Sequence, residues 1–231
     1  MKPRANYIGH DAQYQKYRAA GLNGWNGEAD WLAWKRQLET LCRDQDFPKA
    51  GGLLELGCGA GEVALFFAER GYQVHGIDIA PTAICWAMEK ATASGSTAQF
   101  HVGDVTDLRC YPAASFDIVI DGHCLHCIIG EDRRKVLLET KRVLKPGGFL
   151  YISTMCGDVK DPEMKPLFDP QSRCILSRDG TVAARYVGLP EDIVNEVKSA
   201  GFTIISQQVN DSDDYLSQDL IVHAIKPALI R

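Results

Sequence analysis

Residues 53–80, LLELGCGAGEVALFFAERGYQVHGIDIA, place a glycine-rich turn between an apolar run and an amphipathic helix. The apolar run at 53–56 reads as a short buried strand, and Gly71 is a typical residue to end the helix that follows the turn. A second strand at 72–79 then brings an acid, Asp78, to its carboxyl end. Parallel strands need a crossover connection, usually a helix, so this stretch predicts one unit of a parallel sheet.

The same alternation of strand and helix continues along the chain. Further strands are predicted at 98–104, 116–121 and 147–156, with helices at 81–95, 132–144 and 189–201. Near the C-terminus, TIISQQV and DLIVHAI read as two strands joined by a short acidic loop, which favours an antiparallel pair. Elements of these lengths predict an α/β fold, with helices on both faces of a mostly parallel sheet.

The glycine-rich turn also indicates what the sheet binds. Glycines allow the backbone to turn sharply there, and the following helix presents free N–H groups to a ligand. Asp78 is placed to accept the hydroxyl protons of a ribose. The dinucleotide pattern G-x-G-x-x-G would need glycine at position 62, where the chain has Glu62. With Glu55 adding negative charge, the site suits a cationic ligand that has a ribose and no phosphates.

The motif E-L-G-C-G-A-G resembles the first motif of the class I S-adenosylmethionine-dependent methyltransferases. The resemblance continues through Asp78, GDVTDL (103–108), SFDIVID (115–121) and RVLKPGGFLYIST (142–154), and covers about residues 50–155. It implies a Rossmann-like three-layer sandwich whose seven-stranded sheet has the order 3-2-1-4-5-7-6, with strand seven antiparallel. It also implies S-adenosyl-L-methionine as cofactor.

The resemblance assigns cofactor-binding roles to residues at the ends of four successive strands. It implies that Gly57, Gly59 and Gly61 pass under the methionyl part, while Glu55 orders the turn or contacts the amino group. It implies that Asp78 binds the ribose, Ile79 packs on the adenine, Asp104 accepts from the adenine amino group, Val105 gives a backbone contact, and Asp121 with Gly122 lines the sulfonium end.

The N-terminal segment is rich in aromatic residues and resembles the lid of thiopurine and thiol or halide methyltransferases. This implies a helical lid at 1–48 and a cofactor-binding domain at 49–231, with an insertion at 157–187. Aromatic faces attract a sulfonium and exclude water. The candidates are Tyr7, Tyr14, Tyr17 and Trp25; packing is the alternative for each. Trp31 and Trp34 share one helical face and are expected to dock a helix on the sheet.

The window IDGHCLHCII (120–129) gathers two histidines and two cysteines directly after the fourth strand. His123 and His126 are candidate general bases, because histidine titrates near neutrality; a purely structural role is the alternative. A zinc site needs four ligands, usually from well-separated pairs, so this cluster supplies at most half of one and no metal is expected. The cysteines are expected to be packing residues.

The insertion is expected to form a wall of the acceptor pocket. Arg173, Arg185 and Tyr186 are candidate contacts for an anionic or aromatic substrate, and Tyr186 is counted with the two histidines among the candidate catalytic residues. A solvated loop is the alternative for Arg173. Long loops in compact domains are usually functional or disordered.

Charge and composition narrow the functional classes. The net charge of −5 gives no basic footprint for nucleic acid, and no run approaches the roughly 18 apolar residues that span a membrane. Without a secretory signal, we expect a cytoplasmic protein, monomeric or homodimeric. The 8 cysteines are scattered through apolar segments, which argues against a disulfide framework.

The leading hypothesis is a methyltransferase that acts on nitrogen, oxygen or sulfur of a small molecule. A second is a lyase or cyclase that consumes S-adenosylmethionine itself, for example forming azetidine-2-carboxylate and releasing methylthioadenosine. A third is a module that binds the cofactor without chemistry. The nucleoside product discriminates the first two.

Overall fold

The computed structural model describes residues 4–25, 27–211 and 217–228. Within these residues, seven strands form the main sheet in the order β10-β11-β6-β5-β2-β3-β4. Their bounds are β2 Gly52–Leu56, β3 Gln73–Asp78, β4 Gln99–Val102, β5 Phe116–Gly122, β6 Leu144–Val159, β10 Thr203–Asn210 and β11 Ser217–Ile225. The strand β11 is antiparallel to both neighbours, and the other pairs are parallel. The expected order 3-2-1-4-5-7-6 is therefore confirmed.

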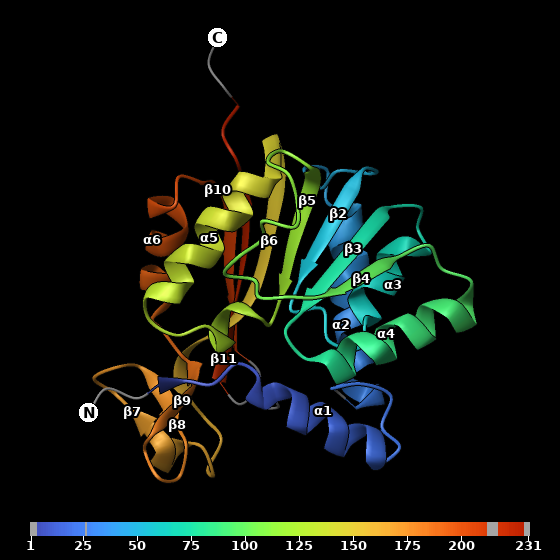
Figure 1. Ribbon diagram of the computed structural model, residues 1–231. Coiled ribbons are helices and arrows are strands. Elements are labelled where there is room, and N and C mark those ends of the chain that lie inside the picture. The colour runs from blue at the N-terminus through green and yellow to red at the C-terminus, as the bar shows by residue number, and fades with distance from the viewer. Residues whose placement is uncertain (1–3, 26, 212–216, 229–231) are drawn as a thin grey trace.

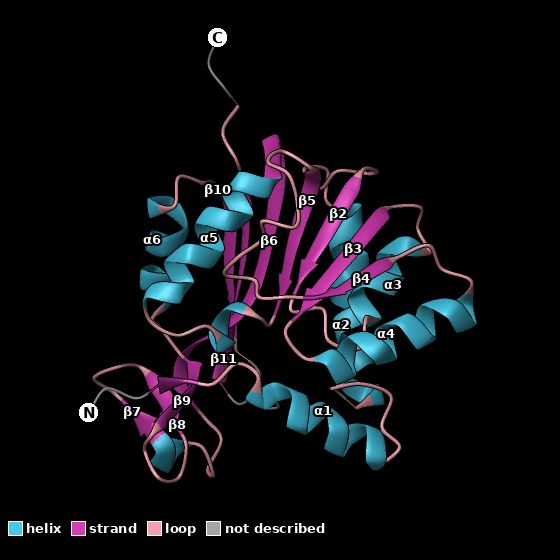
Figure 2. Ribbon diagram, in the orientation of Figure 1, coloured by secondary structure: helices cyan, strands magenta, loops and turns pink. Residues whose placement is uncertain are grey.

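Helices cover both faces of this sheet (Figures 1 and 2). One face carries α5 and α6, and the other carries α2, α3 and α4. The bounds are α2 Glu28–Arg43, α3 Glu62–Ala68, α4 Pro81–Ser94, α5 Glu131–Val143 and α6 Pro190–Ser199. This arrangement is the expected three-layer sandwich.

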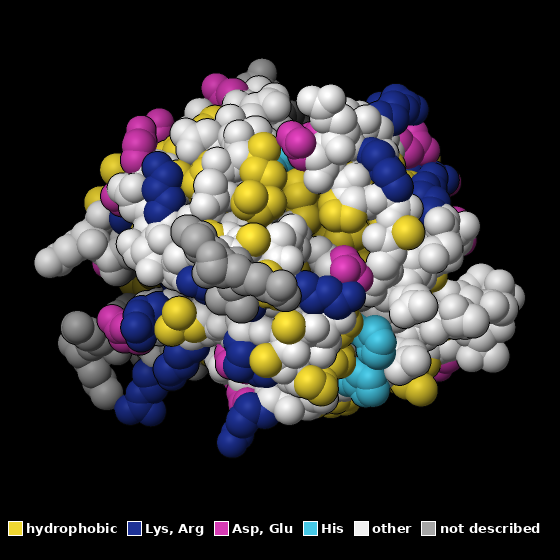
Figure 3. Space-filling view, turned by 90° about the horizontal axis from the view of Figure 1, so that it is seen from above, with side chains coloured by type: hydrophobic (Ala, Val, Ile, Leu, Met, Phe, Trp, Pro, Cys, Tyr) yellow, Lys and Arg dark blue, Asp and Glu magenta, His cyan; other side chains and the backbone are white. Residues whose placement is uncertain are grey.

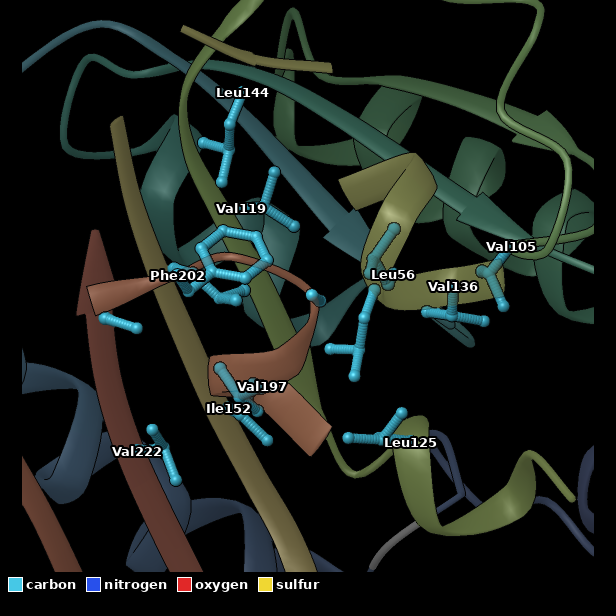
Figure 4. Packing of buried hydrophobic residues seen from close by; sticks show 14 of the residues in the cluster. Leu56, Val105, Val119, Leu125, Val136, Leu144, Ile152, Val197, Phe202 and Val222 are labelled. Atoms are coloured by element: carbon cyan, nitrogen blue, oxygen red, sulfur yellow. The ribbon is translucent and has the colours of Figure 1, made fainter. Parts of the chain in front are cut away.

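Each face of the sheet has its own hydrophobic core. On the side of α5 and α6, sheet residues such as Leu56 and Ile152 pack against Val136 and Val197 (Figure 4). On the other side, Phe67 of α3 and Leu38 of α2 are fully buried. Burying the sheet on both faces explains why its central strands read as nearly continuous apolar runs.

The N-terminal segment lies at the carboxyl edge of the main sheet, where α1 (Gly9–Ala19) crosses below the strands (Figure 1). Side chains tie it to α4: Asp11 accepts a 2.7 Å hydrogen bond from the Thr82 N–H, and Arg18 pairs with Glu89 at 2.6 Å. The following helix, α2, docks on the sheet through buried Leu38, as expected for the face that carries Trp31 and Trp34.

Residues 157–187 differ from the expected long loop. Three short strands of this segment join β1 in a second sheet of the described chain, in the order β1-β9-β8-β7. The bounds are β1 Arg4–Ala5, β7 Phe168–Asp169, β8 Cys174–Leu176 and β9 Val182–Tyr186, with a short helix η2 at Lys165–Leu167. Because β1 pairs with β9, the chain's first described residues complete this sheet, beside α1 at the carboxyl edge. Such short strands in a proline-containing segment give little periodicity to detect.

Two strand boundaries also differ from expectation. The strand expected at 147–156 is longer, because β6 begins at Leu144, directly after α5, and continues to Val159. The strand expected at 98–104 is shorter: β4 ends at Val102, where Gly103 donates to the Asp78 carbonyl and the chain turns away.

At the opposite end of the sheet, where the parallel strands begin, basic, acidic and apolar side chains are interspersed on the surface (Figure 3). No helix in the described part of the chain is long and apolar enough to cross a membrane. All of the cysteines are free thiols, in agreement with the sequence.

Candidate active site

The glycine-rich turn lies at the carboxyl end of β2, between the sheet and the N-terminal segment. Gly57 and Gly59 both have left-handed backbone conformations, with φ of +62° and +53°. A β-carbon on Gly57 would lie 2.7 Å from the Cys124 Sγ, and one on Gly59 would lie 2.4 Å from the Tyr14 hydroxyl. The turn therefore needs glycine for its conformation and for these two close approaches.

Gly61 has a different environment. Its φ is +84°, and a β-carbon there would lie 2.9 Å from the Ala87 Cβ and 3.0 Å from the Phe100 ring. This glycine lets α3 begin close against α4 and β4. Its place under a cofactor remains a prediction, since packing alone accounts for the residue.

Asp78 orders the turn from the end of β3. Its two carboxylate oxygens accept hydrogen bonds from the Gly59 N–H at 2.9 Å and the Ala80 N–H at 2.8 Å. Burial raises the pKa of this carboxyl, and the two N–H groups oppose that rise. The structure therefore holds an acid next to the turn, and binding of a ribose by Asp78 remains a prediction.

The other two acids of this strand and turn have separate environments. Glu55 is buried, and its carboxylate accepts from the Ala64 N–H, while its Oε2 has no hydrogen-bond partner among the described residues. Burial raises the pKa of Glu55 well above its usual range. Glu62 forms an ion pair with Lys90, whose ammonium also donates to the Asn23 carbonyl at 2.6 Å. Glu62 thus helps attach the N-terminal segment.

The predicted adenine contacts follow β3 and β4. Ile79 and Asp104 are half-buried, and Val105 is buried. Asp104 accepts a 2.8 Å hydrogen bond from the Thr106 N–H, which closes the turn after Gly103. The two chain segments are adjacent because β3 and β4 are paired. Adenine recognition by this group remains a prediction.

Aromatic rings of the N-terminal segment cover the glycine-rich turn. Trp25 contacts Tyr14, Tyr17 and His10, at centroid distances of 5.0, 5.3 and 5.8 Å. Tyr14 is buried, and burial raises the pKa of its phenol well above the usual value. The structure thus brings together Tyr14, Tyr17 and Trp25, three of the four candidates from this segment.

Tyr7, the fourth candidate, makes none of these ring contacts, although it lines one cavity together with Tyr17 and Trp25. Its hydroxyl donates to Asp132 Oδ2 at 3.0 Å and accepts from the Ile129 N–H at 3.2 Å. Burial raises the pKa of Tyr7 to about 12. The phenol therefore attaches the N-terminal segment to the loop before α5. Sulfonium contact by Tyr7 remains a prediction.

Asp121 and Gly122 end β5 beside the turn. One Asp121 oxygen accepts from the Cys124 N–H at 3.0 Å and the Leu125 N–H at 3.1 Å, at the start of the short helix η1 (Leu125–Cys127). Burial raises the pKa of Asp121 to about 7. A β-carbon on Gly122 would lie 3.2 Å from the Trp34 ring, so an indole closes this side of the site.

His123 has a left-handed backbone, with φ of +69°. Its Nε2 lies 3.2 Å from Ser153 Oγ and 3.7 Å from Asp219 Oδ1, and its ring meets Trp34 edge-on at 5.5 Å. One third of the side chain, 33%, remains exposed. Burial lowers the pKa of His123, and Asp219 opposes this effect while Arg185 adds to it. A neutral, partly accessible imidazole with a fixed orientation can accept a proton.

His126 is the neighbouring imidazole, with its centroid 5.5 Å from that of His123. It is buried, and its Nδ1 has no hydrogen-bond partner in the described chain. Burial and Arg185 lower its pKa well below the usual value. Among the described residues, no three histidine, cysteine, aspartate or glutamate side chains gather as a metal site requires.

The three candidate residues of the insertion, Arg173, Arg185 and Tyr186, have different surroundings. Tyr186 packs its ring on the Arg133 guanidinium, 4.2 Å away, and Arg133 is itself bonded to Glu196. Arg173 donates to the carbonyl of Val187, directly after β9, and to that of Gly157 in β6, and so links the second sheet to the main sheet. A catalytic role for Tyr186 remains a prediction, because these contacts assign it a packing role.

Arg185 faces a cavity of about 290 Å³ between the N-terminal segment and β9. Its guanidinium lies 6.0 Å from the Trp25 ring and 3.5 Å from Cys127 Sγ, and no carboxylate pairs with it in the described chain. The lining includes the side chains of Tyr7, His10, Tyr17, Trp25, Cys127 and Arg185. The insertion therefore contributes Arg185 to this cavity, and its role as a wall of the acceptor pocket remains a prediction.

Sequence patterns do not identify three residues of this site. The helical spacing of Trp34 indicates a packing residue, yet its ring lies next to both Gly122 and His123. Ser153 and Asp219 lie on β6 and β11, within strands that read as ordinary core segments. The available signal was a polar residue at a buried strand position, since such groups normally have a partner.

The chain matches the family described as "Methyltransferase domain" over residues 54–152. A 2-heptyl-1-hydroxyquinolin-4(1H)-one methyltransferase of Mycobacteroides abscessus is 30% identical over 156 residues, 66% of this chain and 68% of the relative. A ubiquinone biosynthesis O-methyltransferase of Xanthomonas axonopodis pv. citri is 33% identical over 108 residues, 47% of this chain and 44% of the relative. The match thus spans less than half of the second relative.

Among solved structures, the 1,6-didemethyltoxoflavin-N1-methyltransferase of Burkholderia thailandensis superposes with a TM-score of 0.68. It is 21% identical, and the match covers 98% of this chain and 93% of that chain, so it supports the fold. That structure contains S-adenosylhomocysteine and 1,6-didemethyltoxoflavin. The family match, the relative from Mycobacteroides and the fold agree, and the chain belongs to the class I S-adenosylmethionine-dependent methyltransferases.

Proposed function

We propose that this protein transfers a methyl group from S-adenosylmethionine to an ionisable hydroxyl or ring nitrogen of a planar aromatic molecule. The observation that carries the proposal is Arg185, a cation without a carboxylate partner among the described residues, in a cavity lined by Tyr17 and Trp25. Flat rings stack on such aromatic walls, and a guanidinium selects an ionised oxygen or nitrogen.

The relatives favour the same chemistry. The Mycobacteroides relative is named for a hydroxylated quinolone, and the Xanthomonas relative for O-methylation in ubiquinone biosynthesis. The structural neighbour is named for N-methylation of a toxoflavin precursor. We extend to this chain only what these acceptors share, a flat ring system with an attached heteroatom.

The residues at the turn suit the cofactor. Gly57 and Gly59 leave its floor free of side chains, and the acids Asp78 and Asp121 supply negative charge for a sulfonium cation. S-adenosylmethionine, when bound, supplies an electrophilic methyl carbon. We assign Asp78 to the ribose, and Asp104 to the adenine. Tyr14 and Trp25 exclude water from the methionyl side, so the described residues before α2, 4–25, act as a lid, while α2 belongs to the helical layer on the sheet.

The acceptor side provides a base. His123 is next to the turn, because Cys124 contacts Gly57, and Arg185 is near enough to lower the pKa of His123. His123 takes the acceptor's proton, and Arg185 holds the resulting anion. His126 is less suited, because its buried Nδ1 has no hydrogen-bond partner among the residues that the structure describes.

A panel of acceptors tests the proposal. With S-adenosylmethionine and 2-heptyl-1-hydroxyquinolin-4(1H)-one, or a catechol, we expect a methylated product by mass spectrometry. Analogues in which the hydroxyl is already methylated should give none. Turnover of aliphatic amines or thiols with equal efficiency would contradict the assignment of an aromatic, ionisable acceptor.

The second hypothesis, a lyase or cyclase, receives no support from the relatives compared above. Its signature would be methylthioadenosine formed without an acceptor.

A further inference from the structure

The antiparallel strand β11 brings a buried acid to the acceptor side of the site. Because β11 runs against the other strands, its first residues lie at their carboxyl ends, and Asp219 is among them. On the neighbouring strand β6, Ser153 pairs with Ile221, two residues further along β11. Side chains two residues apart point to the same face of a sheet, so Ser153 and Asp219 meet.

These two residues and His123 form a continuous chain. Ser153 Oγ donates to Asp219 Oδ2 at 2.8 Å and lies 3.2 Å from His123 Nε2. The backbone also fixes the histidine, because the His123 N–H donates to the Ser153 carbonyl at 2.9 Å. Ser153 is fully buried and Asp219 is 5% exposed, so water competes little for these contacts.

The direction of these hydrogen bonds selects one tautomer of the histidine. A hydroxyl has a single proton, and Ser153 gives its proton to Asp219 Oδ2. Burial raises the pKa of this carboxyl, while His123 and the Ser153 hydroxyl oppose that rise and favour the ionised form. Ser153 Oγ can then only accept from the imidazole, so His123 carries its proton on Nε2 and has its lone pair on Nδ1. The second carboxylate oxygen, Asp219 Oδ1, has no hydrogen-bond partner in the described chain and lies 3.7 Å from Nε2.

We propose that Asp219, acting through Ser153, is a positioning residue that holds His123 in the Nε2–H tautomer and balances its charge after proton transfer. The inference rests on the proposed function. The acceptor's proton moves to His123 Nδ1, and the acceptor's electron pair forms the new bond to the methyl carbon as the carbon–sulfur bond breaks, its electrons remaining on sulfur. Asp219 then faces the imidazolium, which later loses the proton to water.

The charges around His123 make this arrangement testable by pH. Asp219 faces it from β11, Arg185 from β9 and His126 from the same loop, while Ser153 and Trp34 are uncharged neighbours. Asp219 favours the imidazolium, and Arg185 opposes it. Removing the Asp219 charge should therefore lower the pKa of His123.

The first test needs no acceptor. In nitrogen-15 NMR spectra of the protein saturated with S-adenosylhomocysteine, assigned with His123→Gln, neutral His123 should be protonated on Nε2. Asp219→Asn should move its titration to lower pH, and Ser153→Ala should mix the tautomers. Thr154→Val changes a buried β6 residue of the opposite strand face and is the matched control, expected to change neither.

The second test is the pH profile of kcat/KM with 2-heptyl-1-hydroxyquinolin-4(1H)-one as probe. Asp219→Asn should lower kcat by about tenfold or more, with little change in KM, and shift the acid limb to lower pH. A purely structural role would lower activity without that shift. An unshifted histidine titration or a proton on Nδ1 would overturn the proposal. Failure of the wild type to methylate the probe would instead overturn the proposed acceptor, and the NMR titration would still decide the role of Asp219.

Discussion

The hydroxyl oxygen of Tyr14 lies 2.4 Å from where a β-carbon on Gly59 would be. This close approach joins the N-terminal segment to the glycine-rich turn. On the side of the sheet, the Gly59 N–H donates a hydrogen bond to the Asp78 carboxylate. The turn is therefore fixed between an acid of the sheet and a phenol of α1. Substitutions of Tyr14 or of Asp78 should therefore alter the affinity for the cofactor.

Gly59→Ala should weaken binding of S-adenosylhomocysteine by at least about tenfold, because the new methyl group displaces the Tyr14 hydroxyl and strains a left-handed residue. Calorimetric titration measures this. Gly71→Ala is the matched control, since Gly71 has a φ of +87° but no atom within 4 Å of its missing β-carbon. The Gly71→Ala variant should lose about 1 kcal/mol of folding stability and keep the wild-type affinity for S-adenosylhomocysteine. Equal loss of affinity in both variants would contradict a local role for Gly59.

Asp121→Asn should stabilise the protein at pH 8 and weaken its affinity for S-adenosylmethionine. The pKa of Asp121 is raised to about 7, so the folded state holds the proton more tightly than the unfolded chain does. The ionised Asp121 therefore destabilises the folded state increasingly as pH rises from about 4 to 7. At higher pH this loss of stability stays constant, at a few kcal/mol. Asparagine can keep both accepted hydrogen bonds without the charge.

Thermal denaturation of the wild type and of Asp121→Asn between pH 4 and 8 measures this difference. The melting temperature of the variant should exceed that of the wild type increasingly as pH rises. A variant that is less stable at pH 8 would show that the Asp121 charge is already compensated in the folded protein.

Arg185→Gln should raise KM for an ionised aromatic acceptor by about tenfold or more, the loss of one charge-assisted hydrogen bond. It should also shift the acid limb of the pH profile upward, since Arg185 lowers the pKa of His123. Arg178→Gln, at an exposed position of the same insertion, is the control and should change neither. Steady-state kinetics from pH 5 to 9 measure KM and the pH profile of both variants. An unchanged KM in Arg185→Gln would show that Arg185 does not bind the acceptor.

Tyr7→Phe should loosen the N-terminal segment, because it removes the hydroxyl that contacts Asp132 and the Ile129 N–H. We expect a loss of about 1–2 kcal/mol in local stability. Amide exchange across α1 should become faster, while exchange in β2 stays slow. Unchanged exchange in α1 would show that the contacts to α4 alone retain the segment.

The arrangement of the glycine-rich turn and Asp78 could be predicted from sequence because its signals are local. A strand, a glycine turn and a terminal acid are adjacent in the chain, and they place Gly57, Gly59 and Asp78 together in any parallel sheet. The strand order required the resemblance to a known family. It is confirmed, including the antiparallel β11.

The acceptor side could not be predicted in the same way. Asp219 reaches His123 only because an antiparallel strand returns to the carboxyl edge, a contact that spans 96 positions between residues 123 and 219. The second sheet joins Arg4 of the N-terminus to Val182, and short strands of this kind carry almost no periodicity. Trp34 serves both the core and the site, which a helical pattern cannot distinguish.

The central claim is methyl transfer from S-adenosylmethionine to an aromatic acceptor, and the nucleoside product tests it most directly. Purified protein is incubated with S-adenosylmethionine, with and without 2-heptyl-1-hydroxyquinolin-4(1H)-one, and the products are separated by chromatography with mass detection. We predict S-adenosylhomocysteine in equal amount to a methylated acceptor, and only when the acceptor is present. Methylthioadenosine formed without any acceptor would contradict the account.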